Sequence, residues 1–303
     1  MSLKSLNRPP FLSKGDKIAV VSLASRLDKK RYRQGKKILT ESFGLEVIEG
    51  QHLFAKHHNF AGKDHDRLTD FQSFLDNPEI KAIIAGRGGY GTSRIIDQVD
   101  WTQFKTNPKW IIGFSDITAV HQQLQKMDMQ SIHGPMVVTL TNEEESTESL
   151  KKALFGYSLS YSAARHRFNR FGETIGEIIG GNLCLLAHML GSDSDLSFDD
   201  KILFIEDIGE YYYNIDRMMV QLKRAGKLKK LAGLVVGEFS GSKENSIPFG
   251  KTAYEIVREH TSEYLYPVCF DFPIGHETQN RAVRCGELMQ LVVNNKGVTL
   301  NSI

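Results

Sequence analysis

The sequence predicts an α/β fold whose N-terminal part is a doubly wound, parallel sheet. Short apolar runs such as 18–24 and 80–85 are typical of strands that are covered on both faces. Segments with helical spacing separate these runs, and a helix breaker stands where the spacing ends, as at Asn77-Pro78. Strands and helices that alternate at these distances imply right-handed crossovers and one parallel sheet. Ligands of such sheets bind beyond the carboxyl ends of the strands.

The elements of this part follow one another regularly. Strands are expected at 18–24, 45–48, 80–85, 110–112 and around 131–138. Helices are expected at about 30–43, from Asp64 as the capping residue to Asn77-Pro78, at 92–99, from Ser115 through Leu124, and at 142–155.

The composition changes between about 158 and 172, where serine, aromatic and arginine residues replace the helical pattern. We therefore expect two domains, 1–160 and 161–303, with the boundary uncertain by several residues. In the second domain the pattern predicts helices at 182–190, 214–225 and 249–264, and strands at 202–205, 233–236 and 268–270. The end of the chain, 288–300, has the pattern of a hairpin that turns at Asn294–Gly297.

Charge and cysteine content exclude several classes of protein. The 38 basic and 36 acidic side chains leave a formal net charge of +2, which provides no electrostatic footprint for nucleic acid or an anionic membrane. No apolar run has membrane-spanning length, and the first fifteen residues lack the apolar segment of a signal peptide. The 3 cysteines are scattered and suit a reducing compartment. We expect a cytoplasmic protein with no nucleic-acid or membrane partner.

Ser115 is the first candidate for a catalytic residue. It follows a predicted buried strand, 110–112, and precedes a helical segment. A serine on a sharp strand-to-helix turn can expose its hydroxyl above the sheet, where a base activates it. Serine is also a preferred N-cap residue. The local sequence alone leaves both roles open.

The loop Gly86–Gly91 matches the dinucleotide-binding pattern G-x-G-x-x-G. It follows the third predicted strand instead of the first, and no carboxylate stands about twenty residues later, at 106–109. A dinucleotide-dependent oxidoreductase is therefore the weaker hypothesis. The alternative use of these glycines is to bring backbone N–H groups close to a ligand, as an oxyanion hole requires.

A serine nucleophile needs a base and usually an orienting carboxylate. His276 stands in a polar loop after a predicted strand, although the local sequence alone favours an ordinary surface histidine. Glu206 and Asp207 follow a predicted apolar strand, so they are either exposed or paired. His276-Glu277 lacks a second histidine at metal-binding spacing, and we expect no metal.

Five segments together resemble the LD-carboxypeptidase family of serine peptidases, in that family's order and at similar separations. They are RGGYG (87–91), GFSD (113–116), GGNL (180–183), FIEDIGE (204–210) and PIGH (273–276). The resemblance covers nearly the whole chain. It implies an N-terminal α/β domain resembling class I glutamine amidotransferases, a smaller β-rich C-terminal domain, an active site between them, and a homodimer. By position, Ser115 matches the family nucleophile, Glu206 the acid and His276 the base.

The resemblance implies a cytoplasmic carboxypeptidase that releases terminal D-alanine from a murein tetrapeptide during cell-wall recycling, without a cofactor. A related branch resembles microcin self-immunity peptidases, which cleave a peptidyl-nucleotide amide; a non-catalytic binding protein is a further alternative. The N–H groups of Gly89 and Asp116 are candidates for the oxyanion hole. Arg87, Tyr90 and Asn280 are candidates for binding substrate. The partner of the substrate's terminal carboxylate stays open among Arg87, Arg281 and Arg284.

Overall fold

The computed structural model describes residues 6–140, 144–277 and 279–303, and it confirms the predicted α/β class. The chain forms two compact units. The N-terminal unit comprises Asn7–Tyr157 and Arg281–Arg284. The C-terminal unit comprises Ser158–Asn280 and Cys285–Ile303, together with Leu6. Each unit contains one sheet. No described helix is both long enough and apolar enough to cross a membrane.

The N-terminal unit contains the doubly wound sheet that the apolar runs predict. Its strand order is β11-β5-β4-β3-β1-β2, and the pairings from β2 through β5 are parallel. The order 2-1-3-4-5 is that of flavodoxin-like folds, in which ligands bind where the strand order reverses. The strands are β1 (Lys17–Val21), β2 (Glu46–Glu49), β3 (Ile80–Ala85), β4 (Trp110–Gly113), β5 (Ser131–His133) and β11 (Val283–Cys285).

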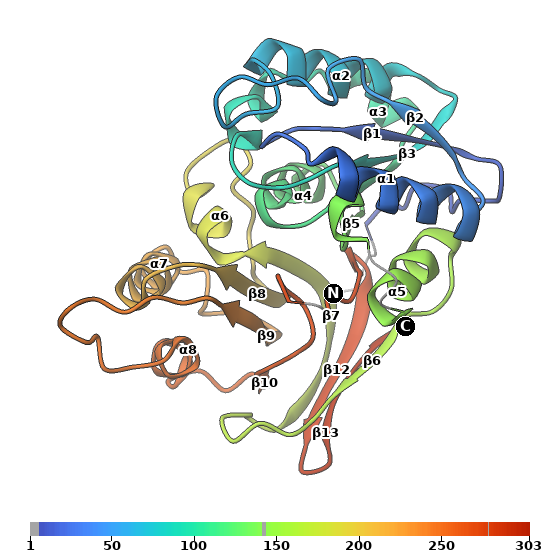
Figure 1. Ribbon diagram of the computed structural model, residues 1–303. Coiled ribbons are helices and arrows are strands. Elements are labelled where there is room, and N and C mark those ends of the chain that lie inside the picture. The colour runs from blue at the N-terminus through green and yellow to red at the C-terminus, as the bar shows by residue number, and fades with distance from the viewer. Residues whose placement is uncertain (1–5, 141–143, 278) are drawn as a thin grey trace. The chain divides into compact units, whose positions relative to one another are not determined.

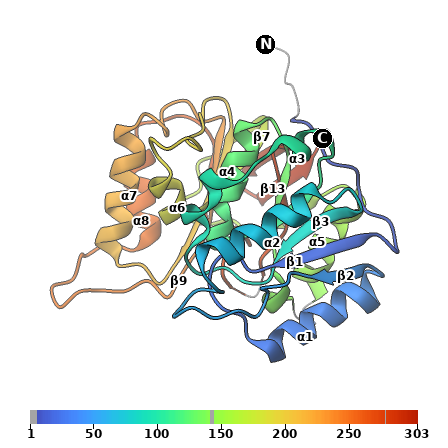
Figure 2. The same cartoon turned by 90° about the horizontal axis from the view of Figure 1, so that it is seen from above.

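Helices cover this sheet, and Figure 1 shows α1 and α2 on opposite sides of β1. The helices are α1 (Lys29–Lys37), α2 (Asp64–Asp76), α3 (Thr102–Thr106), α4 (Thr118–Lys126) and α5 (Glu144–Phe155). A π-helical segment, Ile38–Ser42, extends α1 to the predicted end. Figure 2 shows the same helices from above. The predicted start of α5 at Asn142 lies outside the described residues.

Several predictions for this unit are wrong in detail. The helix expected at 92–99 is two short 3₁₀ helices, Thr92–Arg94 and Ile96–Gln98, and α3 was not predicted. The strand expected at 131–138 ends at His133, because Pro135 lacks the N–H that a strand needs and a 3₁₀ helix follows it at Val137–Thr139. Asp64 is the first residue of α2, and its N-cap is Lys63.

Lys109 fixes the start of β4, the strand that leads to Ser115. Its side chain is buried, and Nζ donates to the carbonyl oxygens of Phe74, Leu75 and Asn77 at 2.9, 2.9 and 2.7 Å. These carbonyls lie at the C-terminus of α2, where backbone acceptors lack helical partners and a cation is favoured. Burial nevertheless lowers the pKa of Lys109 to about 8. The amine thus holds the C-terminus of α2 to the start of β4.

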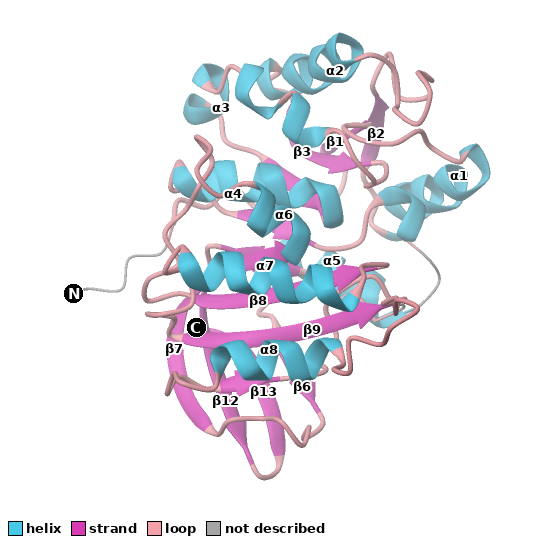
Figure 3. Ribbon diagram, turned by 90° about the vertical axis from the view of Figure 1, so that its left-hand side faces the viewer, coloured by secondary structure: helices cyan, strands magenta, loops and turns pink. Residues whose placement is uncertain are grey.

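The C-terminal unit contains a mixed sheet of order β10-β9-β8-β7-β12-β13-β6. The strands β7 (Gly172–Asn182), β8 (Ile202–Ile208), β9 (Gly233–Ser240) and β10 (Val268–Cys269) are parallel. Beyond β7, the strands β12 (Leu288–Asn294), β13 (Gly297–Ser302) and β6 (Ser160–Ala163) pair antiparallel, which confirms the predicted hairpin. Figure 3 shows α7 (Tyr212–Arg224) and α8 (Ala253–Thr261) along β8 and β9; α6 spans Leu183–His188.

The long strand β7 was not predicted, because its two halves have different surroundings. Residues 172–175 alternate between half-buried and exposed and pair with β12, whereas 176–182 are all buried and 178–182 pair with β8. One strand therefore combines the alternating pattern of an antiparallel sheet with the continuous burial of a parallel one. Three glycines in its buried half, Gly176, Gly180 and Gly181, further obscure the pattern.

Candidate active site

Ser115 stands at the carboxyl end of β4 in a strained backbone conformation. Its φ of 63° lies in the left-handed region, which residues other than glycine rarely adopt. It begins the 3₁₀ helix Ser115–Ile117, whose N-cap is Phe114, so the alternative that Ser115 is itself the N-cap is wrong. Its hydroxyl makes no hydrogen bond to the described residues of its own unit. Such a half-exposed hydroxyl on a strained strand-to-helix turn has the geometry of a nucleophile elbow.

A buried histidine supports this turn from below. His121 is completely buried on α4, and Nε2 lies 2.8 Å from the carbonyl oxygen of Gly113, while Nδ1 lies 2.8 Å from Oγ of Ser131. A carbonyl only accepts, so Nε2 carries the proton and Nδ1 accepts from the hydroxyl. Burial lowers the pKa of His121 to about 4, which keeps the ring neutral. Sequence reasoning missed this role, since His121 shows only unremarkable helical spacing.

The glycine-rich loop lies beside Ser115, as expected for loops that follow the neighbouring strands β3 and β4. A Cβ atom on Gly88 would lie 3.1 Å from Cβ of Ser115, so only glycine permits this approach without a shift. The loop leads into a 3₁₀ helix of three residues, Thr92–Arg94. A dinucleotide fingerprint opens an α-helix whose N-terminus binds the pyrophosphate, and the described structure has none here. The hypothesis of a dinucleotide-dependent oxidoreductase therefore loses its structural basis.

Asp116 joins this loop to the Ser115 turn through its side chain. The residue is completely buried, and Oδ2 accepts the backbone N–H of Thr92 at 2.8 Å. Gly89 and Asp116, the two predicted oxyanion donors, therefore stand on segments that this hydrogen bond connects. The sequence indicated only the backbone of Asp116. The role of its carboxylate depends on a contact 24 residues away.

The C-terminal unit brings together the other two candidate residues. Oε2 of Glu206 lies 2.6 Å from Nδ1 of His276, and the exposed fractions of the side chains are 0% and 11%. Burial alone would lower the pKa of His276, but the charge and hydrogen bond of Glu206, with the charges of Asp207 and Glu238, raise it above its ordinary value. The carboxylate thus orients the imidazole ring through Nδ1.

Glu206 and Asp207 do not follow the strand as predicted but lie within β8, which continues to Ile208. We expected these carboxylates to be either exposed or paired. Both are buried, and both have hydrogen-bond partners. Oδ1 of Asp207 accepts from Nδ2 of Asn182 at 2.8 Å, and Oδ2 accepts the N–H of Cys184 at 3.0 Å. Burial and the charge of Glu206 raise the pKa of Asp207 to about 7. Asp207 therefore ties β8 to the start of α6.

The candidates for substrate binding differ in accessibility. Tyr90 is 50% exposed, and Arg87 is exposed, with one weak contact to the carbonyl of Arg26 at 3.3 Å. Arg281 pairs with Glu145, and Arg284 is buried and donates to the carbonyl of Ala153 at 3.1 Å. Asn280 is also buried, and Oδ1 accepts the N–H of Gly275 at 3.3 Å, next to His276. Of the three arginines, Arg87 is exposed, Arg281 is partly buried and Arg284 is buried.

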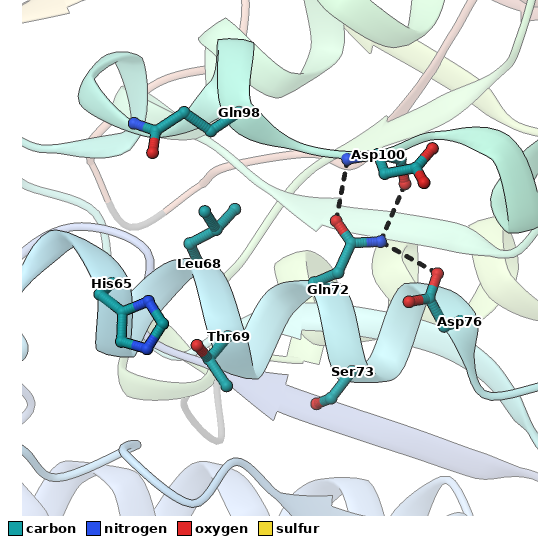
Figure 4. A pocket seen from close by; sticks show the side chains of 8 residues that line it. All are labelled: His65, Leu68, Thr69, Gln72, Ser73, Asp76, Gln98 and Asp100. Atoms are coloured by element: carbon teal, nitrogen blue, oxygen red, sulfur yellow. Dashed lines mark hydrogen bonds between the residues drawn. The ribbon is translucent and has the colours of Figure 1, made fainter.

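A pocket of about 490 Å³ on the N-terminal unit contains none of these candidates. Figure 4 shows Gln72 at its centre, where the amide binds the side chain of Asp76 and the backbone of Asp100 at 2.9 Å. The two bonds to Asp100 hold α2 to the segment that precedes α3. The pocket is lined by His65, Leu68, Thr69, Gln72, Ser73, Asp76, Gln98 and Asp100. Among these described residues, His65 makes no hydrogen bond to the hydroxyl of Thr69 or Ser73, so we do not place the active site there.

Comparisons with known proteins agree with this fold. The family model described as LD-carboxypeptidase N-terminal domain matches residues 18–134, and that of the LD-carboxypeptidase C-terminal domain matches 175–291. A probable murein peptide carboxypeptidase of Bacillus subtilis is 35% identical over 294 residues, which cover 93% of this chain and 91% of that protein.

Two solved structures share the fold. The crystal structure of muramoyltetrapeptide carboxypeptidase from Oxalobacter formigenes has a TM-score of 0.86 and 28% identity, covering 94% of this chain and 98% of that one. The structure of MccF in complex with glutamyl sulfamoyl guanosine has a TM-score of 0.88 and covers 99% of both chains, but its 21% identity supports a common fold alone.

The fold and these relatives define the class of protein: it is a serine-type carboxypeptidase and thus a hydrolase. The chain belongs to the LD-carboxypeptidase family. The resemblance of the five sequence segments is thereby confirmed.

Asp116→Ala is expected to lower kcat by about 10- to 100-fold with a smaller change in KM, because the oxyanion donors lose their fixed spacing. Asp116→Asn keeps an oxygen that accepts the N–H of Thr92 and should recover most of the rate. Steady-state kinetics of both variants measure this. Asp70→Ala is the control, since Asp70 is also buried and accepts a backbone N–H, that of His52 at 2.8 Å. Equal kcat losses in all three variants would contradict the assignment.

Proposed function

We propose that this protein hydrolyses the L,D-peptide bond that releases terminal D-alanine from murein tetrapeptide. Ser115 is the nucleophile, His276 the base and Glu206 the orienting acid, with the nucleophile in the domain 1–160 and the acid and base in 161–303. The observation that carries the proposal is the 2.6 Å contact between buried Glu206 and Nδ1 of His276. A histidine held in this way by a buried carboxylate matches the base of a serine hydrolase.

The mechanism has two chemical steps. Nε2 of His276 takes the hydroxyl proton as Oγ of Ser115 attacks the carbonyl carbon before the terminal D-residue. The oxyanion that forms accepts hydrogen bonds from the N–H groups of Gly89 and Asp116. The protonated His276 then gives its proton to the leaving amine. In the second step His276 takes a proton from water as the water attacks the acyl-enzyme, and it returns that proton to Oγ of Ser115. The mechanism requires Ser115 and His276 to come within hydrogen-bonding distance, and it uses no metal ion or organic cofactor.

The substrate assignment rests on the names that the relatives carry. The B. subtilis relative is called a probable murein peptide carboxypeptidase, and the O. formigenes structure is a muramoyltetrapeptide carboxypeptidase. Exposed Arg87 is our candidate for binding the terminal carboxylate, with Tyr90 beside it. We also keep Asn280 as a candidate for binding substrate. Its hydrogen bond to Gly275 supports the loop that carries His276. Murein-peptide hydrolysis of this kind belongs to cytoplasmic cell-wall recycling, and we propose that the protein acts there as a homodimer.

The alternative substrate is a peptidyl-nucleotide amide, as for the microcin-immunity branch. The neighbour MccF, solved with glutamyl sulfamoyl guanosine, is 21% identical, whereas the muramoyltetrapeptide carboxypeptidase is 28% identical. The murein peptide is therefore the first substrate to test.

Purified protein incubated with L-Ala-D-Glu-diaminopimelyl-D-Ala is expected to release D-alanine, measured by chromatography or a coupled D-amino-acid oxidase assay. A peptidyl-adenylate amide, assayed side by side, should be cleaved far more slowly. The all-L peptide that ends in L-alanine is the control for stereochemical selectivity. Cleavage of only the adenylate would refute the murein assignment and retain the serine mechanism. Lack of activity on every substrate would refute the proposal.

A further inference from the structure

The parallel pairing of β8 and β9 contains an irregularity beside the base. Ile205 pairs with Val236, but Asp207 pairs with Phe239. One residue of β8, Glu206, therefore stands opposite two residues of β9, Gly237 and Glu238. Such a bulge redirects side chains and is frequent next to active sites. Here it places a second glutamate beside the carboxylate that contacts His276.

The loop that carries His276 packs directly onto this bulge. A Cβ atom on Gly275 would lie 3.2 Å from Cβ of Glu238 and 3.5 Å from Cβ of Glu206, so both glutamates border the same glycine. Gly275 has a φ of 149°, which other residues rarely adopt. The two glutamates thus lie on the same side of the loop.

Glu238 contacts the His276 loop on both sides of the histidine. Its backbone N–H donates to the carbonyl oxygen of Ile274 at 3.0 Å, two residues before His276. Its carboxylate Oε2 accepts the N–H of Glu277 at 3.1 Å, one residue after it. One residue therefore holds the loop at both flanks, whereas Glu206 holds the imidazole ring itself.

The surroundings of Glu238 are acidic, and the side chain is only partly exposed. Burial is the main factor that raises its pKa to about 7; the hydrogen bond from the N–H of Glu277 opposes the rise. The titratable groups around it come from β8, α8 and the loop after β10: Glu206, Tyr254, Asp271, His276 and Glu277. Its negative charge also helps to raise the pKa of His276.

We propose that Glu238 is a positioning residue for the base: its carboxylate fixes the backbone around His276, and its charge stabilises the protonated imidazole. The inference rests on the proposed function for its catalytic meaning, but its structural content concerns the C-terminal unit alone. Glu206 fixes the orientation of the imidazole ring, and Glu238 fixes the backbone of the loop that carries the ring. Neither role substitutes for the other.

Two substitutions separate the two effects. Glu238→Gln removes the charge but keeps an oxygen that accepts the N–H of Glu277, so kcat should stay within about threefold of wild type at neutral pH. The midpoint of His276 titration should fall, because a negative charge that favours the imidazolium is gone. Glu238→Ala also loses the acceptor, and kcat should fall by about fivefold to tenfold, with KM changing less.

The titration is measured by NMR of the imidazole protons, which needs no substrate. The chain has 10 histidines, so the signal of His276 is identified by its loss in His276→Gln. Glu177→Gln is the matched control, because Glu177 is a buried carboxylate of the same unit that pairs with Lys201. It should leave the midpoint of His276 unchanged, and thermal melting confirms that each variant is folded.

An unchanged His276 midpoint in folded Glu238→Gln, together with an unchanged kcat in Glu238→Ala, overturns the proposal. A midpoint that falls in Glu238→Gln but not in Glu177→Gln supports it. If the wild-type enzyme releases no D-alanine, the proposed function fails while the titration still decides the electrostatic role of Glu238. The two failures are therefore distinguishable.

Discussion

Ser115→Ala is expected to reduce kcat by about 10⁴-fold or more and to leave the free energy of unfolding nearly unchanged. The hydroxyl makes no hydrogen bond to the described residues of its unit, so its removal leaves no buried group unpaired. Alanine and serine pay similar strain at the φ of 63°. Release of D-alanine and thermal melting, measured on the same preparations, test both halves of this expectation.

Ser149→Ala should show the opposite pattern. The hydroxyl of Ser149 accepts the N–H of Ala282 at 2.9 Å and donates to the carbonyl of Ser146 at 2.7 Å. Its loss should lower stability by about 1 kcal/mol and leave kcat unchanged. Ser115→Gly relieves the left-handed strain and should melt no lower than Ser115→Ala while remaining inactive. Turnover within tenfold of wild type in Ser115→Ala would rule out Ser115 as the nucleophile.

The sheet around Ser115 could be predicted because its signals are local. The apolar runs of β1, β3 and β4 each lie within a few residues, and parallel strands between helices have few possible arrangements. Strands that follow one another in such a sheet often lie side by side, and the close approach of Gly88 to Ser115 shows that the loops after β3 and β4 are neighbours. The left-handed φ of Ser115 was not predicted, because serine has no local preference for that region.

The second half of the candidate site depends on contacts between distant segments. Glu206 and His276 are 70 residues apart, and their contact follows from the pairing of β8 with β9 and the loop on that edge. The five segments of the family resemblance indicated the pair, whereas local pattern placed Glu206 beyond its strand. Glu238 had no signal in the sequence, because its position follows from a one-residue shift in strand register that no local pattern encodes.

Glu206→Gln is expected to lower kcat by about 10³- to 10⁴-fold, although the side chain keeps its size and shape. The protonated histidine that forms in the transition state would then lack its buried counter-charge, and the amide also permits the wrong tautomer. Its contribution to raising the pKa of His276 disappears as well, so the midpoint of His276 titration should fall. Kinetics and NMR titration of the same variant measure both effects.

The stability of Glu206→Gln should behave differently from its activity. A carboxylate with 0% exposure pays a large desolvation cost, and Oε1 of Glu206 has no hydrogen-bond partner among the described residues. Replacing this charge by an amide should therefore leave the melting temperature within about 4 °C of wild type. Such a result would indicate that this buried charge serves the proposed catalysis and is not required for folding.

Asp207→Asn is the matched control, since Asp207 is the next residue of β8 and is also buried, at 3% exposure. Its bonds to Asn182 and Cys184 hold the start of α6 and do not involve the ring of His276. It should lose less than about tenfold in kcat, because its charge acts on His276 only at a distance. Equal losses of kcat in Glu206→Gln and Asp207→Asn would mean that the two carboxylates of β8 act on His276 only through their negative charge. A loss confined to Glu206→Gln assigns the orientation of the base to the single contact at Nδ1.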